Sequence, residues 1–148
     1  MRPPMTEAGT AATLARLAEI LGPGGLLRDP AGMAGFATDW RGLRPGRPLA
    51  VARPATTEAV AGMLALCDAA GLGVVPQGGN TSLAAGATPD ESGRQIVLWL
   101  GRMNRVLAID PVDLVLTAEA GVTLAAAQAA AAARGCRLAL SLASEGSA

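Results

Sequence analysis

The sequence of 148 residues contains no histidine and no tyrosine, and its basic side chains are twelve arginines without a lysine. The absence of histidine excludes, within these residues, a Ser-His-Asp triad, a histidine general base, histidine metal ligands and a cofactor attached covalently to histidine. Without histidine, lysine or tyrosine, the chain has few groups that exchange protons near neutral pH. We therefore expect a bound cofactor to carry the chemistry of any reaction that this protein serves.

The charge is balanced, because twelve acidic residues match the twelve arginines and leave a formal net charge of zero. Binding to a nucleic-acid backbone requires a clustered basic surface, which this sequence does not provide. Its only aromatic residues are Phe36, Trp40 and Trp99, which are too few for a base-stacking surface. We expect these residues to pack in the core, with a buried Asp39–Trp40 pair beside a cofactor as the alternative for Trp40. No nucleic-acid partner is expected.

The two cysteines are Cys67 and Cys136, which lie far apart in apolar surroundings and form no C-x-x-C motif. They are typical of buried free thiols in a reducing compartment. The N-terminus leads into an amphipathic segment, and the sequence has no uninterrupted apolar run of about 18 residues. We therefore expect a soluble, cytoplasmic protein without a membrane span.

The most informative segment is a short β-branched run, Val74-Val75, that enters a loop rich in glycine and small polar residues. Glycines let a ligand approach the main chain closely, and successive N–H groups in such a loop can converge on phosphate oxygens. A P-loop of the usual form is impossible without lysine, so main-chain amides would hold a diphosphate, with Arg102 or Arg105 as possible helpers. The loop predicts a nucleotide cofactor, and the alternative is an ordinary tight turn. The candidate cofactor-binding residues are Pro76, Gln77, Gly78, Gly79, Asn80, Thr81, Ser82 and Leu83.

The pattern of apolar residues and capping signals predicts two regions, an N-terminal helix and connection at 1–48 and a domain at 49–148. In the first region, one helical face carries Leu14, Leu17, Ala18 and Leu21, and the helix ends at Gly22-Pro23-Gly24-Gly25. In the second region, a strand at 50–54 leads into a helix capped by Thr56 and ended by Gly71, and the next strand delivers the glycine loop. These segments form a βαβ unit.

Three apolar runs follow, at 96–100, 105–109 and 114–118, with only short breaks between them. Because a parallel connection needs about a dozen residues, the short breaks predict an antiparallel meander. Thr123 then caps an alanine-rich helix that continues to about Arg134, and residues 137–140 are expected to form a last strand. The fold class is α+β.

Several of these motifs occur together in one known family. Val75-Pro76-Gln77-Gly78-Gly79-Asn80-Thr81, Arg102-Met103-Asn104-Arg105-Val106 and Glu119-Ala120-Gly121-Val122 closely resemble the FAD-binding domain of the vanillyl-alcohol-oxidase/PCMH flavoprotein superfamily. The upstream runs Thr38-Asp39-Trp40-Arg41-Gly42 and Arg53-Pro54-Ala55-Thr56-Thr57-Glu58 are similar to its D-lactate, glycolate and D-2-hydroxyglutarate dehydrogenase group. The chain departs from the pattern at Ser82, where members often carry glycine.

The resemblance implies a PCMH-type FAD-binding fold, with the first subdomain and the start of the second present here. It implies that the loop from Pro76 to Leu83 cradles the FAD pyrophosphate, and that a loop beginning at Gly146 and Ser147 continues around the flavin. We expect the chain to be an N-terminal fragment whose FAD domain is incomplete at its C-terminus. No catalytic residue and no metal ligand are assigned.

The function implied by the resemblance is that of an FAD-dependent oxidoreductase, which in its complete form oxidises a D-2-hydroxy acid to the 2-oxo acid by hydride transfer to FAD. One alternative is a non-catalytic FAD- or nucleotide-binding subunit that needs a completing polypeptide. The other is an inert truncation product whose sheet lacks partners. Retention of a yellow chromophore would distinguish the first two hypotheses from the third.

Overall fold

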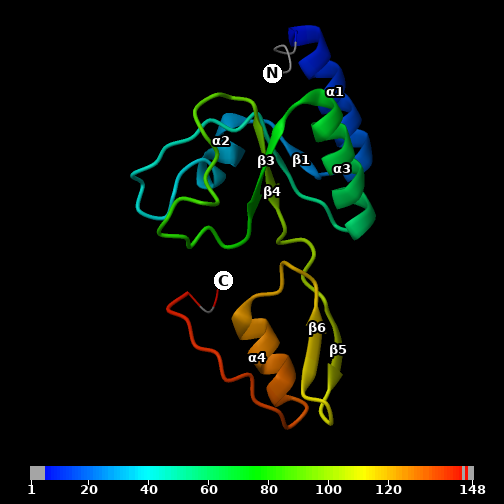
Figure 1. Ribbon diagram of the computed structural model, residues 1–148, viewed down its shortest axis with the longest axis vertical. Coiled ribbons are helices and arrows are strands. Elements are labelled where there is room, and N and C mark those ends of the chain that lie inside the picture. Colours follow the sequence, from blue (N-terminus) through cyan, green and yellow to red (C-terminus); the bar gives the residue numbers. More distant parts are fainter. Residues whose placement is uncertain (1–5, 145, 147–148) are drawn as a thin grey trace.

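A computed structural model describes residues 6–144 and 146 of the chain. These residues form two units, a four-stranded sheet with its helices and, below it in Figure 1, a two-stranded sheet with one helix. The combination of helices with open, mixed sheets confirms the predicted α+β class. The elements in chain order are α1 (Glu7–Leu21), β1 (Leu26–Leu27), α2 (Pro30–Met33), the 3-10 helix η1 (Ala34–Phe36), β2 (Ala50–Ala52), α3 (Thr57–Ala70), β3 (Gly73–Gln77), β4 (Gln95–Trp99), β5 (Val106–Asp110), β6 (Val115–Ala118) and α4 (Leu124–Ala132).

The first sheet has the strand order β1-β2-β4-β3. The predicted βαβ unit is present as β2, α3 and β3, but β4 lies between its two strands and is parallel to both. Val97 in β4 is paired with Val51 of β2 on one side and Val75 of β3 on the other. The crossover from β3 to β4 is the segment 78–94, which is long enough for a parallel connection and carries the glycine loop.

The predicted meander is wrong at its first strand. β4 is central in the first sheet, whereas β5 and β6 pair antiparallel with each other in a separate sheet. The composition of β4 explains its position, since Ile96, Val97 and Leu98 are all buried, as is typical of a parallel strand that is covered on both faces. The chain leaves the first sheet after β4, so the short connection at 100–105 joins two units.

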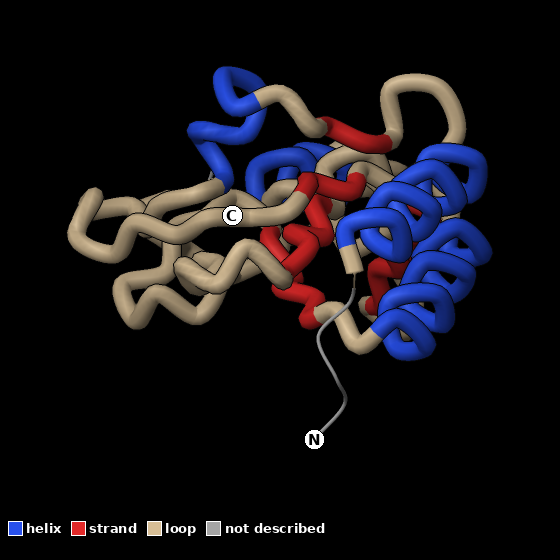
Figure 2. The backbone as a smooth tube through the Cα atoms, turned by 90° about the horizontal axis from the view of Figure 1, so that it is seen from above, coloured by secondary structure: helices blue, strands red, loops and turns tan. Residues whose placement is uncertain are grey.

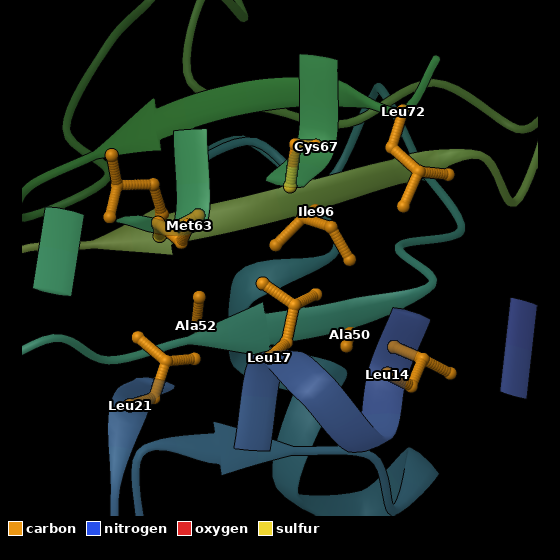
Figure 3. Close-up of a cluster of buried hydrophobic side chains, with 10 residues drawn as sticks. Leu14, Leu17, Leu21, Ala50, Ala52, Met63, Cys67, Leu72 and Ile96 are labelled. Carbon is orange, nitrogen blue, oxygen red and sulfur yellow. The ribbon is translucent and has the colours of Figure 1, made fainter. Parts of the chain in front are cut away.

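Helices α1 and α3 lie side by side and cover one face of the first sheet (Figures 1 and 2). Their apolar stripes meet the alternate residues of β2 and β4 that point toward them (Figure 3). The predicted stripe of α1 is confirmed, because three of its leucines are buried. The core cluster consists of Leu14, Leu17, Leu21, Ala50, Ala52, Met63, Cys67, Leu72, Ile96 and Leu98.

The helix ends follow the predicted local signals. The Thr56 hydroxyl accepts a hydrogen bond from the Ala59 amide at the start of α3, and Gly71 ends this helix with φ 64°. Thr123 caps α4 in the same way, by accepting a hydrogen bond from Ala126. Among the described residues, no helix is both long and apolar enough to cross a membrane.

The strand expected at 137–140 does not form among the described residues. This segment instead returns along α4 toward the first unit, and the carbonyl oxygen of Leu140 accepts a hydrogen bond of 2.6 Å from the Gln128 side chain (Figure 1). Its residues are mostly exposed, and it pairs with neither strand of the β5-β6 sheet.

The three aromatic residues differ in their burial. Phe36 and Trp99 pack edge to face at a centroid distance of 5.9 Å, but both are only partly buried and neither belongs to the core cluster. Trp40 is 68% exposed, so the prediction of a core residue is wrong for it.

Cys67 is buried and Cys136 partly buried, and both are free thiols. Burial raises the pKa of the Cys67 thiol, which makes it unreactive at neutral pH.

Candidate cofactor site

The glycine loop lies at the carboxyl end of β3, beside the carboxyl end of β4, which is the edge where ligands bind in open parallel sheets. A cleft of about 410 Å³ opens there between the two units of the fold. The loop forms one wall, and the turns before β5 and before α4 form the other. The lining residues are Gly78, Gly79, Trp99, Gly101, Asn104, Ala120, Gly121, Val122, Thr123 and Ala126.

The main-chain amides of the glycine loop are free to bind a ligand. Among the described residues, no acceptor receives a hydrogen bond from the N–H groups of residues 78–82. A methyl group added at Gly78 would meet no atom of this chain within 4 Å, so the space above this residue is open. The loop thus has the donor set and the room that a diphosphate requires.

The opposite wall includes the first turn of α4, with Thr123 and Ala126 lining the cleft. The positive end of a helix dipole favours an anion at this place. No charged side chain of the described residues lines the cleft. The electrostatic attraction for an anionic ligand would therefore come from main-chain amides, as the lysine-free sequence predicts.

Asn80 holds the loop in its conformation. Its φ of 54° lies in the left-handed region, which asparagine tolerates better than most residues. Its side-chain amide donates a hydrogen bond of 2.7 Å to the carbonyl oxygen of Thr38. Ser82 has no positive φ, so the difference from glycine at this position introduces no backbone strain; its hydroxyl accepts a hydrogen bond from the Ala84 amide.

Gln77 is 2% exposed and fixes the base of the loop. Its Nε2 group donates to the carbonyl oxygens of Phe36 and Ala87, at 3.1 and 2.9 Å. These contacts occupy the amide that the sequence offered for cofactor binding. Pro76 lies on the edge strand β3, where a missing N–H is tolerated, and its ring is exposed. Neither side chain lines the cleft.

A second cleft of about 460 Å³ lies on the other side of Gly79. It contains the remaining loop residues, Thr81 and Leu83, together with the indole of Trp40. Ala143 and Ser144 complete it from the segment after α4. Of the two residues expected to continue around the flavin, Gly146 is exposed and lines neither cleft, and Ser147 lies outside the described residues.

The arginines near the site are engaged elsewhere. The Nε and Nη2 groups of Arg105 both donate to Oε1 of Glu119, whose Oε2 accepts a hydrogen bond from the Arg105 amide. The hydrogen bonds from the Arg105 side chain and amide lower the pKa of Glu119 despite burial, which acts to raise it. Arg102 donates to the carbonyl oxygen of Arg53. Neither arginine lines the cleft, so the structure gives no support for a role on the diphosphate.

Asp39 is buried and organises the turn that carries Trp40. Its Oδ1 accepts a hydrogen bond of 2.6 Å from the Arg44 amide, while Oδ2 lies 3.8 Å from the Nε of Arg41. Burial acts to raise the pKa of Asp39, but the main-chain hydrogen bonds from Arg44, Leu43 and Arg41 outweigh it, so the pKa is lowered. The carboxylate is therefore charged at neutral pH.

Several lining residues were missed when the sequence was read, among them Trp99, Gly101 and Gly121. A signal was available for the two glycines, since each follows an apolar strand and permits a close approach. A Cβ at Gly101 would strike the Trp99 ring, and one at Gly121 would strike the Leu100 carbonyl oxygen. Among the described residues, no group of three or more acidic or cysteine side chains is placed to hold a metal.

Comparison with known proteins gives a consistent result. The profile of a family described as FAD binding domain matches residues 48–148. The chain is 39% identical over 121 residues to a putative mitochondrial D-lactate dehydrogenase of Schizosaccharomyces pombe, covering 80% of this chain and 22% of the relative. It is 37% identical over 136 residues to the mitochondrial D-2-hydroxyglutarate dehydrogenase of Bos taurus, covering 90% of this chain and 24% of the relative.

The fold is similar to that of p-cresol methylhydroxylase with substrate bound, with a TM-score of 0.76 and 19% identity over 94% of this chain and 27% of the other. This likeness confirms the predicted PCMH-type fold. The chain spans 22% to 24% of the two relatives' length. The family match covers most of the chain and confirms FAD as the predicted cofactor. The chain therefore belongs to the family described as FAD binding domain.

Proposed function

We propose that this chain forms the diphosphate-binding part of a flavoprotein that oxidises a D-2-hydroxy acid to the 2-oxo acid. The observation that carries this proposal is the row of amides at residues 78–82, which have no hydrogen-bond acceptor among the described residues. The row begins with Gly78 and Gly79, which line a cleft without charged side chains. Main-chain donors and a helix N-terminus suit a cofactor diphosphate that must be held and retained.

The proposed roles divide the loop into contacting and positioning residues. The amides of Gly78, Gly79, Asn80, Thr81 and Ser82 would hold the diphosphate. The side chains of Gln77 and Asn80 keep these amides in place through their hydrogen bonds to carbonyl oxygens. When bound, FAD supplies the acceptor for the hydride that leaves the substrate α-carbon. Pro76, Leu83, Gly146 and Ser147 stay predicted cofactor contacts.

The substrate class rests on the relatives. Two of them are named for D-lactate and D-2-hydroxyglutarate, which share a hydroxyl group on the carbon next to a carboxylate. The proposal therefore covers 2-hydroxy acids as a class, and it assigns no catalytic residue to this chain. The substrate and the electron acceptor are properties of the whole protein. The relatives are about four times as long as this chain.

A second candidate is a cofactor-binding subunit that is completed by another polypeptide. It is favoured by the second unit, where β5 and β6 expose Leu107 (57%) and Val115 (53%), and the turn between them exposes Leu114 (79%). Apolar side chains in a two-stranded sheet are usually covered by further structure. A completing polypeptide, in the same chain or another, would bury them.

The division into regions 1–48 and 49–148 is also a proposal, and the family match to residues 48–148 supports its boundary. The first region is packed against the second, since β1 pairs with β2 and α1 contacts α3. For the compartment we propose a reducing one such as the cytoplasm, on the basis of the free thiols. Both reported relatives are named as mitochondrial, which makes the mitochondrial matrix the alternative.

The proposal is tested by adding FAD to the purified chain and recording absorbance of the retained fraction after ultrafiltration. Gly78→Ala places a methyl group in the open space of the cleft, so the variant should fold normally and lose at least tenfold in FAD affinity. Gly86→Ala is the matched control, because its methyl group also meets no atom within 4 Å but points outside the lining of the cleft. Equal affinity of both variants, or no flavin retained by the folded wild-type chain, would refute the proposed site.

A further inference from the structure

Trp40 is the largest side chain that this fold leaves exposed, with 68% of its surface open to solvent. Indole rings are usually packed against other residues, and exposed ones are often used for binding. Trp40 does not stand alone on a convex surface. It forms a wall of the second cleft, whose other lining residues are Gly79, Thr81, Leu83, Ala143 and Ser144.

The Trp40 cleft continues the diphosphate cleft. Both are lined by Gly79, the first cleft on the side of Gly78 and Trp99 and the second on the side of Thr81 and Leu83. The amides of Gly78, Gly79 and Thr81, from residues that line one or both clefts, have no hydrogen-bond acceptor among the described residues. A ligand whose diphosphate binds these amides would therefore reach into both clefts, with one ring system on each side.

The turn that carries Trp40 is held on both sides. Asp39 accepts a hydrogen bond from the Arg44 amide, and Arg41 donates one of 3.0 Å to the carbonyl oxygen of Leu83. The isolated bridge between Thr38 and Pro45 closes the base of the turn. The turn that carries the indole is thus held beside the loop before any ligand binds, which lowers the entropy lost on binding.

We propose that the indole of Trp40 packs against the isoalloxazine ring of FAD. This inference rests on the proposed function, because it requires the diphosphate to lie on the glycine loop. The indole is electron-rich and the isoalloxazine is planar and electron-poor, so the two rings stack favourably. The indole lines the Trp40 cleft and not the diphosphate cleft, so the isoalloxazine is assigned to this side of Gly79. The adenosine part would occupy the cleft between the two units.

The test follows the indole N–H signals of the two tryptophans by two-dimensional NMR of the ¹⁵N-labelled chain, assigned with Trp40→Phe, while ultrafiltration measures bound flavin. FAD should shift the Trp40 signal strongly, and ADP at saturating concentration should leave it in place. FAD bound with an unmoved Trp40 signal would overturn the inference and leave the proposed function intact. A Trp40 shift with ADP alone would place adenine there and overturn it too. Absence of flavin binding by the folded chain would overturn both.

The affinities of variants give an independent readout. Trp40→Ala should weaken FAD binding by about tenfold through loss of the aromatic contact, and Trp40→Phe should restore most of it. Leu43→Ala is the matched control, since Leu43 is 65% exposed on the same turn but lines a different cleft. The affinity for ADP should be the same in all three variants. Equal FAD affinity of Trp40→Ala and Leu43→Ala would contradict the stacking contact.

Discussion

The side-chain amide of Asn80 donates a 2.7 Å hydrogen bond to the carbonyl oxygen of Thr38, which joins the glycine loop to a turn 42 residues earlier in the chain. Gln77 similarly donates a hydrogen bond to the carbonyl oxygen of Phe36, and Arg41 in the earlier segment donates one to the carbonyl oxygen of Leu83. The segment before β2 is therefore part of the candidate site, because it sets the position of the loop whose amides would bind the cofactor.

Asn80 has two separable roles, and two substitutions distinguish them. Asn80→Gly keeps the left-handed conformation and loses only the side-chain hydrogen bond, at a cost of about 1 kcal/mol. Asn80→Ala also places an ordinary side chain at φ 54°, so its free energy of unfolding should be roughly 1 kcal/mol lower still. Urea unfolding measures both values. A glycine variant less stable than the alanine variant would contradict the left-handed conformation of residue 80.

Gln77 satisfies two carbonyl oxygens from a buried position. Gln77→Leu keeps the volume but leaves the carbonyl groups of Phe36 and Ala87 without this donor, which should lower the free energy of unfolding by about 2 kcal/mol. FAD affinity should fall as well, since the loop loses its support. Gln128→Leu removes a single hydrogen bond at the surface of α4 and serves as the control. Similar unfolding curves for the two variants would argue against a supporting role for Gln77.

Local signals in the sequence were sufficient to predict much of the secondary structure. Thr56, Thr123 and Gly71 act through groups within four residues of themselves, so their roles can be recognised without tertiary information. The glycine loop was recognised for a similar reason, because glycine, asparagine and small polar residues have local conformational preferences. The order of the motifs along the chain then carried the family resemblance.

Long-range placement could not be predicted in the same way. β4 and β5 are separated by a short turn, which suggested pairing, yet β4 pairs with two strands that precede it. The choice depends on burial of both faces of β4, which only the assembled sheet provides. The prediction that Trp40 packs in the core was wrong for a related reason. Tryptophan is usually a core residue, but here Asp39 and Arg41 hold its turn at the edge of a cleft.

Gly121 permits a close approach between the turn before α4 and the connection at 100–105. Its amide donates a hydrogen bond of 2.8 Å to the Met103 carbonyl oxygen, and a Cβ would lie 2.9 Å from that oxygen and closer still to that of Leu100. Gly121→Ala should therefore shift the turn that lines the cleft and lower the free energy of unfolding by roughly 2 kcal/mol. Gly35→Ala, with open space at its Cβ, should change the melting temperature little. Equal melting temperatures of the two variants would contradict the close contact.

Glu119 makes the stability of the second unit depend on pH. Its carboxylate accepts hydrogen bonds from the Arg105 guanidinium and amide, so its pKa is lower in the folded chain than its ordinary value of 4.5. A lowered pKa means that the carboxylate contributes stability above the unfolded-state pKa and loses it as the pH falls through the folded-state pKa. The free energy of unfolding should therefore decrease as the pH is lowered below about 5.

Glu119→Gln removes this titration but retains an acceptor for the Arg105 amide. The variant should be less stable than the wild type at pH 7, and the difference between the two should shrink toward pH 3, where the wild-type carboxylate gains a proton. Urea unfolding at pH 3, 5 and 7 measures the difference, and Glu91→Gln controls for the change in net charge at an exposed loop. A difference that stays constant across this range would mean that the ion pair with Arg105 does not stabilise the folded chain, and that the turn beside Asn104 is held by the main chain alone.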